Sequence, residues 1–277
     1  MSAHHMQKTD LRPLTLITGG AQGIGKALAI EFAKTGHDLL LVSRNEQKLE
    51  KTAGKISEQY DVAVLVLACD LTLVESTAEI ENLLYDKQYY VQNLVNNAGF
   101  GLAGPFAGHQ PDEIHTMIDL NVRALTDLSR LFLPDMLARK AGGILNVSSM
   151  GGLLPGPYQA AYYASKAYVI SLTQALSWEC LGSGVHISTL APGPVRTDFH
   201  ATMGARSELY VKSGAGISAK KAARMGYSGF KCGQCLIIPS FLGQIGALAL
   251  KILPHDLLMP VMGWFLKARI KQHGQSD

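Results

Sequence analysis

The sequence of 277 residues predicts one α/β domain, in which helices cover both faces of a doubly wound, seven-stranded parallel sheet. Two observations carry this prediction. Short apolar runs rich in β-branched residues alternate with segments of about 12 to 25 residues whose apolar positions recur at helical spacing, and a crossover between parallel strands requires such a length. The chain also contains no internal repeat, low-complexity block or linker that would divide it.

Seven runs are predicted to be strands: Leu14–Thr18, Asp38–Ser43, Val62–Cys69, Val91–Asn96, Ile144–Ser148, Val185–Leu190 and Gln234–Ile238. The first helix is expected to begin near Gly23, directly after the first strand, because Ala27, Ile30 and Ala33 recur at helical spacing. Residues 1–10 are polar and are expected to form a disordered tail. The single domain is therefore expected to span 11–277.

The composition argues against several classes of protein. The formal net charge of +3 comes from scattered Lys and Arg without a long basic run, so nucleic-acid binding is not expected. Four dispersed cysteines are too few to cross-link a chain of this length with disulfides, and no secretory segment is recognised. Both observations indicate a reducing, cytoplasmic location. Cys232 and Cys235 form a C-x-x-C pair without a second ligand pair at suitable spacing, so no metal site is predicted.

The segment of about 239–272 is expected to be an apolar extension of the domain. Its runs Phe241–Leu253 and Leu257–Leu266, with Pro254 between them, predict two short helices. Each run is shorter than the roughly 20 residues that span a bilayer, so no transmembrane helix is expected. Three roles stay open for the extension: it covers the substrate, packs against another subunit, or makes peripheral contact with a membrane.

A glycine-rich turn follows the first strand and has the sequence Thr18-Gly19-Gly20-Ala21-Gln22-Gly23-Ile24-Gly25. Glycines at a strand-to-helix turn let the backbone approach a pyrophosphate, and the N-terminus of the helix offers unpaired N–H groups to the anion. The alternative is an ordinary turn between a strand and a helix, since the spacing differs from the common G-x-G-x-x-G.

The second strand ends in Val42-Ser43-Arg44, at the point where folds that bind NAD usually carry a carboxylate for the ribose 2′-hydroxyl. Arg44 can instead pair with a 2′-phosphate, which favours NADPH, unless Arg44 is only a solvated residue at the start of the next helix. Asp70 is expected near the adenine and Asn97-Ala98-Gly99 near the ribose, because open α/β sheets bind ligands at the carboxyl ends of their strands.

Tyr162 and Lys166 are four residues apart in a predicted helix and therefore share one face. A nearby ammonium favours the phenolate and brings the tyrosine pKa toward the range in which it can shuttle a proton at neutral pH. Ser148 and Ser149 end the fifth strand, and Ser149 can donate to a carbonyl oxygen that becomes negative during hydride transfer. Asn121 can hold a water chain from Lys166 or, alternatively, tie helix backbone to a neighbouring loop.

In these motifs the chain resembles the short-chain dehydrogenase/reductase family from about Leu14 to Ile238. The resemblance implies a Rossmann fold in which Tyr162 is the general acid/base and Lys166 binds the nicotinamide ribose and lowers the tyrosine pKa. It also implies that Ser149 positions the substrate and that Asn121 completes a proton relay, and it favours Ser149 over Ser148 and Tyr162 over Tyr163. The motifs are T-G-x-x-x-G-x-G at Thr18–Gly25, N-N-A-G at Asn96–Gly99, Asn121, Ser149, Tyr162 with Lys166, and Pro192-Gly193 followed by Thr197.

The resemblance further implies a lid over the substrate at about 198–228 and a homo-oligomer, dimer or tetramer, formed through the helices that contain Asn121 and Tyr162. The residues expected to bind NADP(H) are Thr18, Gly19, Gln22, Gly23, Ile24, Gly25, Ser43, Arg44, Asp70, Leu71, Asn97, Ala98, Gly99, Tyr162, Lys166, Pro192, Gly193, Val195 and Thr197.

The sequence therefore predicts an NADPH-dependent oxidoreductase that reduces a ketone or oxidises a secondary alcohol. The apolar extension is similar to that of family members acting on steroids or ketoacyl thioesters, which favours a lipophilic small-molecule substrate. The alternative is an NADPH-binding sensor or scaffold without turnover, and the complete set of catalytic residues argues against it.

Overall fold

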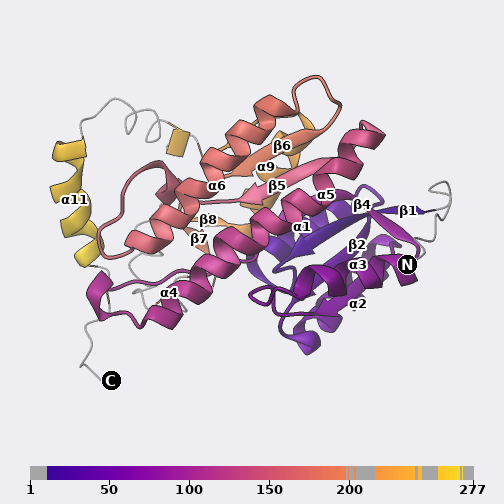
Figure 1. Ribbon diagram of the computed structural model, residues 1–277, viewed down its shortest axis with the longest axis horizontal. Coiled ribbons are helices and arrows are strands. Elements are labelled where there is room, and N and C mark those ends of the chain that lie inside the picture. Colours follow the sequence, from indigo (N-terminus) through magenta and orange to yellow (C-terminus); the bar gives the residue numbers. More distant parts are fainter. Residues whose placement is uncertain are drawn as a thin grey trace, which may run out of the picture.

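The computed structural model describes residues 11–197, 199, 203, 216–240, 243–244, 255–268 and 270. A seven-stranded sheet runs through the domain (Figure 1), and its order is β3-β2-β1-β4-β5-β6-β9 with every neighbouring pair parallel. The predicted α/β fold class is confirmed. The strands are β1 (Arg12–Thr18), β2 (Asp38–Ser43), β3 (Val64–Ala68), β4 (Tyr89–Asn96), β5 (Gly143–Val147), β6 (His186–Leu190) and β9 (Leu236–Ile237).

The strand boundaries differ from the predicted ones in two places that matter for the site. β5 ends at Val147, so Ser148 and Ser149 both lie beyond the strand. The last strand is shorter than predicted, because only Leu236 and Ile237 pair with β6. Strand ends depend on pairing with a neighbour, which the periodicity of one segment does not contain.

Helices cover both faces of the sheet. α1 (Gly23–Ala33), α2 (Glu46–Tyr60) and α9 (Ala219–Lys231) pack on one face, and α3 (Ser76–Asp86), α5 (Leu125–Arg139) and α6 (Ala160–Glu179) pack on the other. The other elements are η1 (Phe106–Gly108), α4 (Pro111–Ile118), the π-helical turn η2 (Asp119–Ala124), η3 (Met150–Leu153), α11 (His255–Lys267), and the paired strands β7 (Val195–Arg196) and β8 (Ile217–Ser218).

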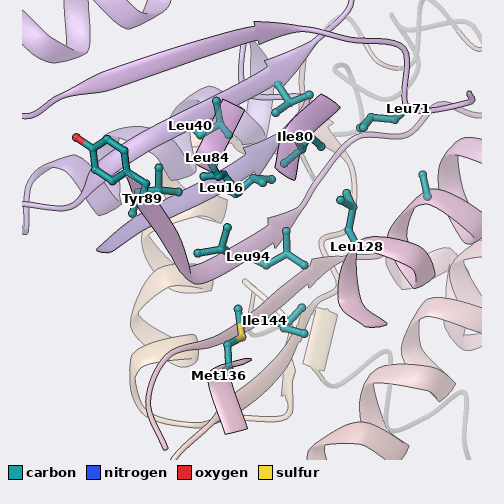
Figure 2. Packing of buried hydrophobic residues seen from close by; sticks show 14 of the residues in the cluster. Leu16, Leu40, Leu71, Ile80, Leu84, Tyr89, Leu94, Leu128, Met136 and Ile144 are labelled. Carbon is teal, nitrogen blue, oxygen red and sulfur yellow. The ribbon is translucent and has the colours of Figure 1, made fainter. Parts of the chain in front are cut away.

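Figure 2 shows the core on the α3 and α5 side of the sheet. Leu16, Leu40 and Leu94 project from β1, β2 and β4, and Ile80 and Leu128 cover them from α3 and α5. Each of these side chains is at most 1% exposed. Because the central strands are covered on both faces, they consist of nearly continuous apolar runs, which is the pattern that predicts them.

The strand order reverses direction between β1 and β4. The chain moves outward from β1 through β2 to β3, and then in the other direction from β4 through β5 and β6 to β9. The helices that follow β1 and β4 therefore pack on opposite faces of the sheet. A crevice results at the carboxyl ends of these two strands, where doubly wound sheets bind their ligands.

The predicted tail and lid lie largely outside the described residues. The tail 1–10 is outside them, and of the lid at 198–228 only residues 199, 203 and 216–228 are described. Residues 219–228 belong to α9, which packs against α1 with Ala222, Ala223 and Gly226 buried. This part of the expected lid is therefore a fixed member of the helical layer.

The apolar extension contains α11, which includes the predicted run Leu257–Leu266 and continues through Pro260. Of the first predicted run, Phe241–Leu253, only Gly243 and Gln244 are described. Among the described residues, no helix is both long enough and apolar enough to cross a membrane.

Candidate active site

A cleft of about 1210 Å³ opens at the carboxyl ends of the parallel strands. Residues that follow β1, β2, β3, β4, β5 and β6 all line it, as expected where the loops of an open α/β sheet meet. One part is polar and contains the glycine-rich loop and Arg44. The other part is apolar and contains Tyr163 and three side chains of α11.

The glycine-rich loop is fixed by bonds and close contacts. Gly19 has φ of +65°, which glycine adopts without strain, and its N–H donates to the carbonyl oxygen of Val42 at 2.7 Å. A Cβ at Gly25 would overlap the carbonyl oxygen of Gly19 and the amide nitrogen of Asn97, so only glycine lets α1 pack this closely. α1 begins at Gly23, which lines the cleft, so unpaired N–H groups of its first turn are available to an anion.

Thr18 and Asn97 connect the ends of β1 and β4. Thr18 Oγ1 accepts hydrogen bonds from the N–H groups of Asn97 and Ala98, both at 3.0 Å. In return, Asn97 Nδ2 donates to the carbonyl oxygens of Thr18 at 3.0 Å and Gly19 at 3.2 Å. These reciprocal bonds set the distance between the two strands at the crevice.

Two of the basic side chains that line the cleft, Arg44 and Lys48, lie close to each other in its polar part. Arg44 follows β2 and Lys48 lies one helical turn further on, in α2, and both are exposed. Asn45 caps α2 by accepting a bond from the N–H of Lys48 at 2.8 Å, and Lys48 Nζ lies 3.4 Å from Gln22 Oε1 in the glycine-rich loop. This pair of cations suits a phosphate group that is separate from the pyrophosphate.

Asp70 lines the cleft beside this pair. Burial alone would raise the pKa of its carboxyl group, but bonds from the N–H of Thr72 at 3.0 Å and its hydroxyl at 2.8 Å, together with the Arg44 guanidinium, lower that pKa. Asp70 is therefore ionised at neutral pH and presents a hydrogen-bond acceptor to the cleft.

Tyr162 and Lys166 lie close together on α6, as their spacing predicts. Lys166 Nζ is 6.0 Å from the centre of the Tyr162 ring and donates to the carbonyl oxygen of Val147 at 3.1 Å. Lys166 is 5% and Tyr162 8% exposed, and burial lowers the pKa of Lys166 to about 8. At neutral pH the protein therefore holds an ammonium near the phenol, where exclusion of water strengthens its charge effect.

Ser149 is the second residue after β5 and caps η3. Its Oγ accepts a hydrogen bond from the N–H of Gly151 at 3.0 Å, and this bond leaves the hydroxyl hydrogen for another partner. Ser149, Tyr162 and Lys166 all line the cleft. The structure thus brings the predicted hydroxyl, phenol and ammonium into one cavity.

Asn121 lies in η2, and π-helical turns of this kind frequently occur at functional sites. Its Oδ1 accepts from the N–H of Phe100 at 3.1 Å, and its Nδ2 donates to the carbonyl oxygen of Phe100 at 2.9 Å and to Ser165 Oγ at 3.1 Å. Both amide hydrogens are therefore used within the protein. Asn121 thus ties its helix to the loop after β4, while its part in a water chain from Lys166 stays a prediction.

Most of the predicted site residues line the cleft, whereas Thr18, Gly25 and Asn121 lie behind its surface and hold neighbouring segments in place. The residues that line it are Gly19, Gln22, Gly23, Ile24, Ser43, Arg44, Asp70, Leu71, Asn97, Ala98, Gly99, Ser149, Tyr162, Lys166, Pro192, Gly193, Val195 and Thr197.

Several polar residues in or next to the site were not identified from the sequence, among them Lys48 and Ser165. The others that line the cleft are Asn45, Thr72, Thr116, Gln159 and Arg196. Lys48 lies four residues after Arg44, and that helical spacing is the signal that could have identified it. Ser165 accepts from Asn121 and donates to the carbonyl oxygen of Tyr162 at 2.7 Å. Its position three residues after Tyr162 is the spacing at which a helical serine bonds back to the main chain.

The apolar part of the cleft is built from segments that are far apart in the sequence. Met262, Phe265 and Leu266 come from α11, shown in yellow at the left end of Figure 1. The extension therefore lines the cleft, and its role in covering the substrate stays a prediction. The other apolar residues here are Phe100, Leu120, Met150, Leu154, Tyr163, Phe199 and Met203.

All four cysteines are free thiols, including the C-x-x-C pair, Cys232 and Cys235, that follows α9. Within the described ranges, no three His, Cys, Asp or Glu side chains are grouped closely enough to hold a metal ion. The expectation that the protein has no metal site stays a prediction.

The fold and the cleft together define a nucleotide-dependent oxidoreductase of the Rossmann type. Residues 13–208 match the family model described as short chain dehydrogenase. The chain therefore belongs to the short-chain dehydrogenase family, as its motifs predict.

Similar proteins cover most of the chain. Very-long-chain 3-oxoacyl-CoA reductase of Mus musculus is 32% identical over 262 residues, which are 91% of this chain and 79% of that protein. A short-chain dehydrogenase from Sphingobium yanoikuyae in complex with NADPH is 30% identical with a TM-score of 0.77, over 96% of this chain and 99% of that one. The bulky-bulky ketone specific alcohol dehydrogenase from Comamonas testosteroni is 26% identical with a TM-score of 0.73, over 97% and 98%.

We expect Gly99→Ala to reduce kcat by at least about tenfold without unfolding the protein, because small displacements of reacting groups are costly. A Cβ at position 99 would lie 2.7 Å from Asn121 Oδ1 and 3.3 Å from Lys166 Nζ, so both side chains would have to move. Steady-state kinetics and circular dichroism measure the two effects. Gly54→Ala is the control, since nothing lies within 4 Å of a Cβ there. Equal kcat in the two variants would contradict the geometry.

Proposed function

We propose that the protein reduces a ketone, or oxidises the corresponding secondary alcohol, with NADP(H) as its cofactor. The Lys166 ammonium, buried near the Tyr162 phenol in the cleft that also contains Arg44, carries this proposal. Burying a cation costs free energy, and a protein that only binds a nucleotide has no use for it. The relatives named above are reductases and dehydrogenases, which also favours an enzyme over a sensor or scaffold.

The residues of the cleft fit NADPH. The backbone at Gly19 and Gly23 would hold the pyrophosphate, and Arg44 with Lys48 would hold the 2′-phosphate. Asp70 would accept a bond from the adenine. A Cβ built on Gly23 would lie 3.6 Å from Thr197, so the loop after β6 closes against the glycine-rich loop, where it would contact the nicotinamide carboxamide. When bound, NADPH supplies the hydride.

The side chains of the protein would handle the proton and the charge on the substrate oxygen. Tyr162 donates its hydroxyl proton to that oxygen in reduction and accepts it in oxidation. The Lys166 ammonium stabilises the phenolate, and the Ser149 hydroxyl donates a second hydrogen bond to the oxygen. Both donors favour the transition state, in which the oxygen is more negative than in the ketone.

The proton lost by Tyr162 would be replaced through Lys166 and water near Asn121. The position that a Cβ would occupy at Gly99 is 2.7 Å from Asn121 Oδ1 and 3.3 Å from Lys166 Nζ, so these two groups are neighbours. Because the amide hydrogens of Asn121 are already used, its remaining role toward such a water is that of an acceptor.

The substrate would be lipophilic, such as a ketoacyl thioester or a steroid. The cleft beyond Tyr162 is lined mainly by aliphatic, thioether and aromatic side chains, and methionine adapts to ligands of different shape. The mouse relative is named for very-long-chain 3-oxoacyl-CoA, and the Comamonas testosteroni structure for bulky ketones. Both names agree with a large substituent on the carbonyl carbon.

We also propose a cytoplasmic location and a homo-oligomer, dimer or tetramer, formed through the η2–α5 helix and α6. Four free cysteines suit a reducing compartment. Trp178 and Leu181 at the end of α6 are 78% and 75% exposed, which suits a contact between subunits.

Two further roles are proposed for segments near the cleft. On α11, Val261 and Trp264 are exposed and would make any peripheral contact with a membrane. The segment after Thr197 would act as a lid.

We expect Tyr162→Phe to lower kcat by about a hundredfold or more, because general acid–base catalysis contributes that much. The affinity for NADPH, measured by fluorescence titration, should stay within about twofold, since the phenol hydroxyl is proposed to act on the substrate. Tyr168→Phe is the control, because Tyr168 lies on the same helix and its hydroxyl bonds to Thr126 at 2.9 Å. A Tyr162→Phe variant that kept most of its rate would rule out this acid/base assignment.

We expect Arg44→Ala to weaken NADPH binding at least about tenfold, since it removes a charge-assisted bond to the 2′-phosphate. NADH binding should change little. Lys48→Ala should also weaken NADPH binding more than NADH binding, but by a smaller factor. Titration of each variant with both nucleotides measures this. Lys51→Ala is the control, because Lys51 is exposed on α2 but does not line the cleft. Equal losses for NADPH and NADH would refute the phosphate assignment.

We expect Met262→Ala to raise KM for a twelve-carbon methyl ketone by about tenfold and to leave a four-carbon methyl ketone nearly unchanged. The longer ketone would bury its chain against α11, and each buried methylene contributes about 0.8 kcal/mol. Val261→Ala is the control, since Val261 is 64% exposed on the same helix. If Met262→Ala affected both ketones equally, α11 would not contact the substrate chain.

A further inference from the structure

Lys166 is attached to the end of β5 at two points. Its ammonium donates to the carbonyl oxygen of Val147 at 3.1 Å, and Ser148 Oγ donates to the main-chain carbonyl oxygen of Lys166 at 2.7 Å. Val147 and Ser148 are consecutive. Two neighbouring residues therefore bond to Lys166, one to its ammonium group and the other to its main-chain carbonyl oxygen. The mechanism described above uses neither the Ser148 hydroxyl nor this second bond.

Ser148 is itself held firmly by the sheet. Its N–H donates to the carbonyl oxygen of Leu190 at 2.8 Å, and the residue is 4% exposed. Its hydroxyl therefore has a fixed position from which it can locate α6. A buried hydroxyl that donates to a main-chain carbonyl is satisfied without help from water.

The carbonyl oxygen of Lys166 is also the point at which η3 packs on α6. A Cβ at Gly152 would lie 2.5 Å from this oxygen, so the backbone of η3 approaches it closely. Ser149 caps the same turn. The Ser148 bond thus joins β5 to α6 at a place where a shift of the helix would change both the Lys166 position and the surroundings of Ser149.

A buried ammonium on a long flexible side chain has a strong tendency to move toward water. The bond to Val147 restrains only the end of the side chain. The position of the Lys166 backbone, from which the side chain starts, depends on how α6 packs on β5. The Ser148 hydroxyl bonds to α6 at Lys166 itself. Asn146 also bonds to α6, but at Thr173, about two turns further along, so loss of the Ser148 bond would loosen the helix locally at Lys166 and let Nζ move relative to the Tyr162 ring.

We propose that Ser148 is a positioning residue for the reaction: its hydroxyl fixes α6 on the end of β5 and thereby holds the Lys166 ammonium at the distance from Tyr162 that catalysis requires. This inference rests on the proposed function of Tyr162 and Lys166. Ser148 also lines the cleft, but its hydroxyl hydrogen is used in the bond to Lys166, so it acts through Lys166 and not on the substrate.

The test compares Ser148→Ala with the wild type in alcohol oxidation across a pH series. We expect kcat to fall about tenfold, which corresponds to about 1.4 kcal/mol. The rising limb of the pH profile should move to higher pH by about half a unit, since a displaced ammonium stabilises the Tyr162 phenolate less. The affinity for NADPH, measured by fluorescence, should change less than about twofold, because the cation pair and the glycine-rich loop are untouched.

Two controls separate positioning from loss of a buried hydroxyl. Ser188→Ala removes a buried hydroxyl from β6 whose oxygen has no hydrogen-bond partner among the described residues, so its pH profile should match the wild type. Ser148→Thr and Ser148→Val have nearly the same shape, and only threonine keeps the hydroxyl. We expect Ser148→Thr to keep most of the rate and Ser148→Val to behave like Ser148→Ala, which decides the question even if the alanine variant is unstable.

The outcomes are distinct. The positioning role is supported if the rising limb of the pH profile shifts in Ser148→Ala and Ser148→Val but not in Ser148→Thr or Ser188→Ala. An unshifted limb in both, or equal rates for Ser148→Thr and Ser148→Val, would overturn it while leaving the proposed function intact. A wild-type protein that binds NADPH but turns over no ketone or alcohol would instead remove the proposed function, and the inference with it.

Discussion

The reversal of strand order between β1 and β4 is the constraint on which the rest of the site depends. Because all strands of the sheet are parallel, the loops after them emerge at one edge, and because α1 packs on one face while the helices after β4 pack on the other, that edge is open at its centre. The reciprocal bonds between Thr18 and Asn97 fix the two strands at this point. A glycine-rich loop and a catalytic helix separated by more than a hundred residues can therefore line one cleft.

Buried polar groups then determine how the helices sit on this frame. Asn96 Nδ2 donates to Asn146 Oδ1 at 2.9 Å and to Ser129 Oγ of α5 at 3.1 Å, and Asn146 Nδ2 donates to Thr173 Oγ1 of α6 at 2.9 Å. Apolar contacts alone permit small sliding of a helix on a sheet, whereas hydrogen bonds between buried groups are satisfied in one arrangement only. The same principle operates at the end of β5, where Lys166 is bonded through its side chain and its main chain.

The two parts of the cleft use different physical effects for different tasks. In the polar part, exposed cations and helix N–H groups give charge complementarity, which suits a phosphorylated ligand that has to bind and leave. In the part near Tyr162, burial removes water from Lys166 and lowers its pKa to about 8, so that the charge acts on the phenol without being screened. The apolar residues of α11 line the same cleft and offer the proposed lipophilic substrate a surface against which it would be buried.

The sequence by itself determined the fold class, the order of the strands along the chain and a set of site residues, most of which line the cleft. The fold class and strand order follow from periodicity. The glycine-rich turn and the helical spacing of Tyr162 and Lys166 follow from local pattern, and most of the remaining site residues follow from the resemblance of the motifs to the family. Only the tertiary structure decided that Asn121 bonds to the Phe100 loop through its side chain, that Lys48 lies with Arg44 in the cleft, that α11 lines the cleft, and that Ser148 bonds to Lys166. The reason is that each of these depends on the packing of segments distant in sequence, and no pattern within one segment contains that information.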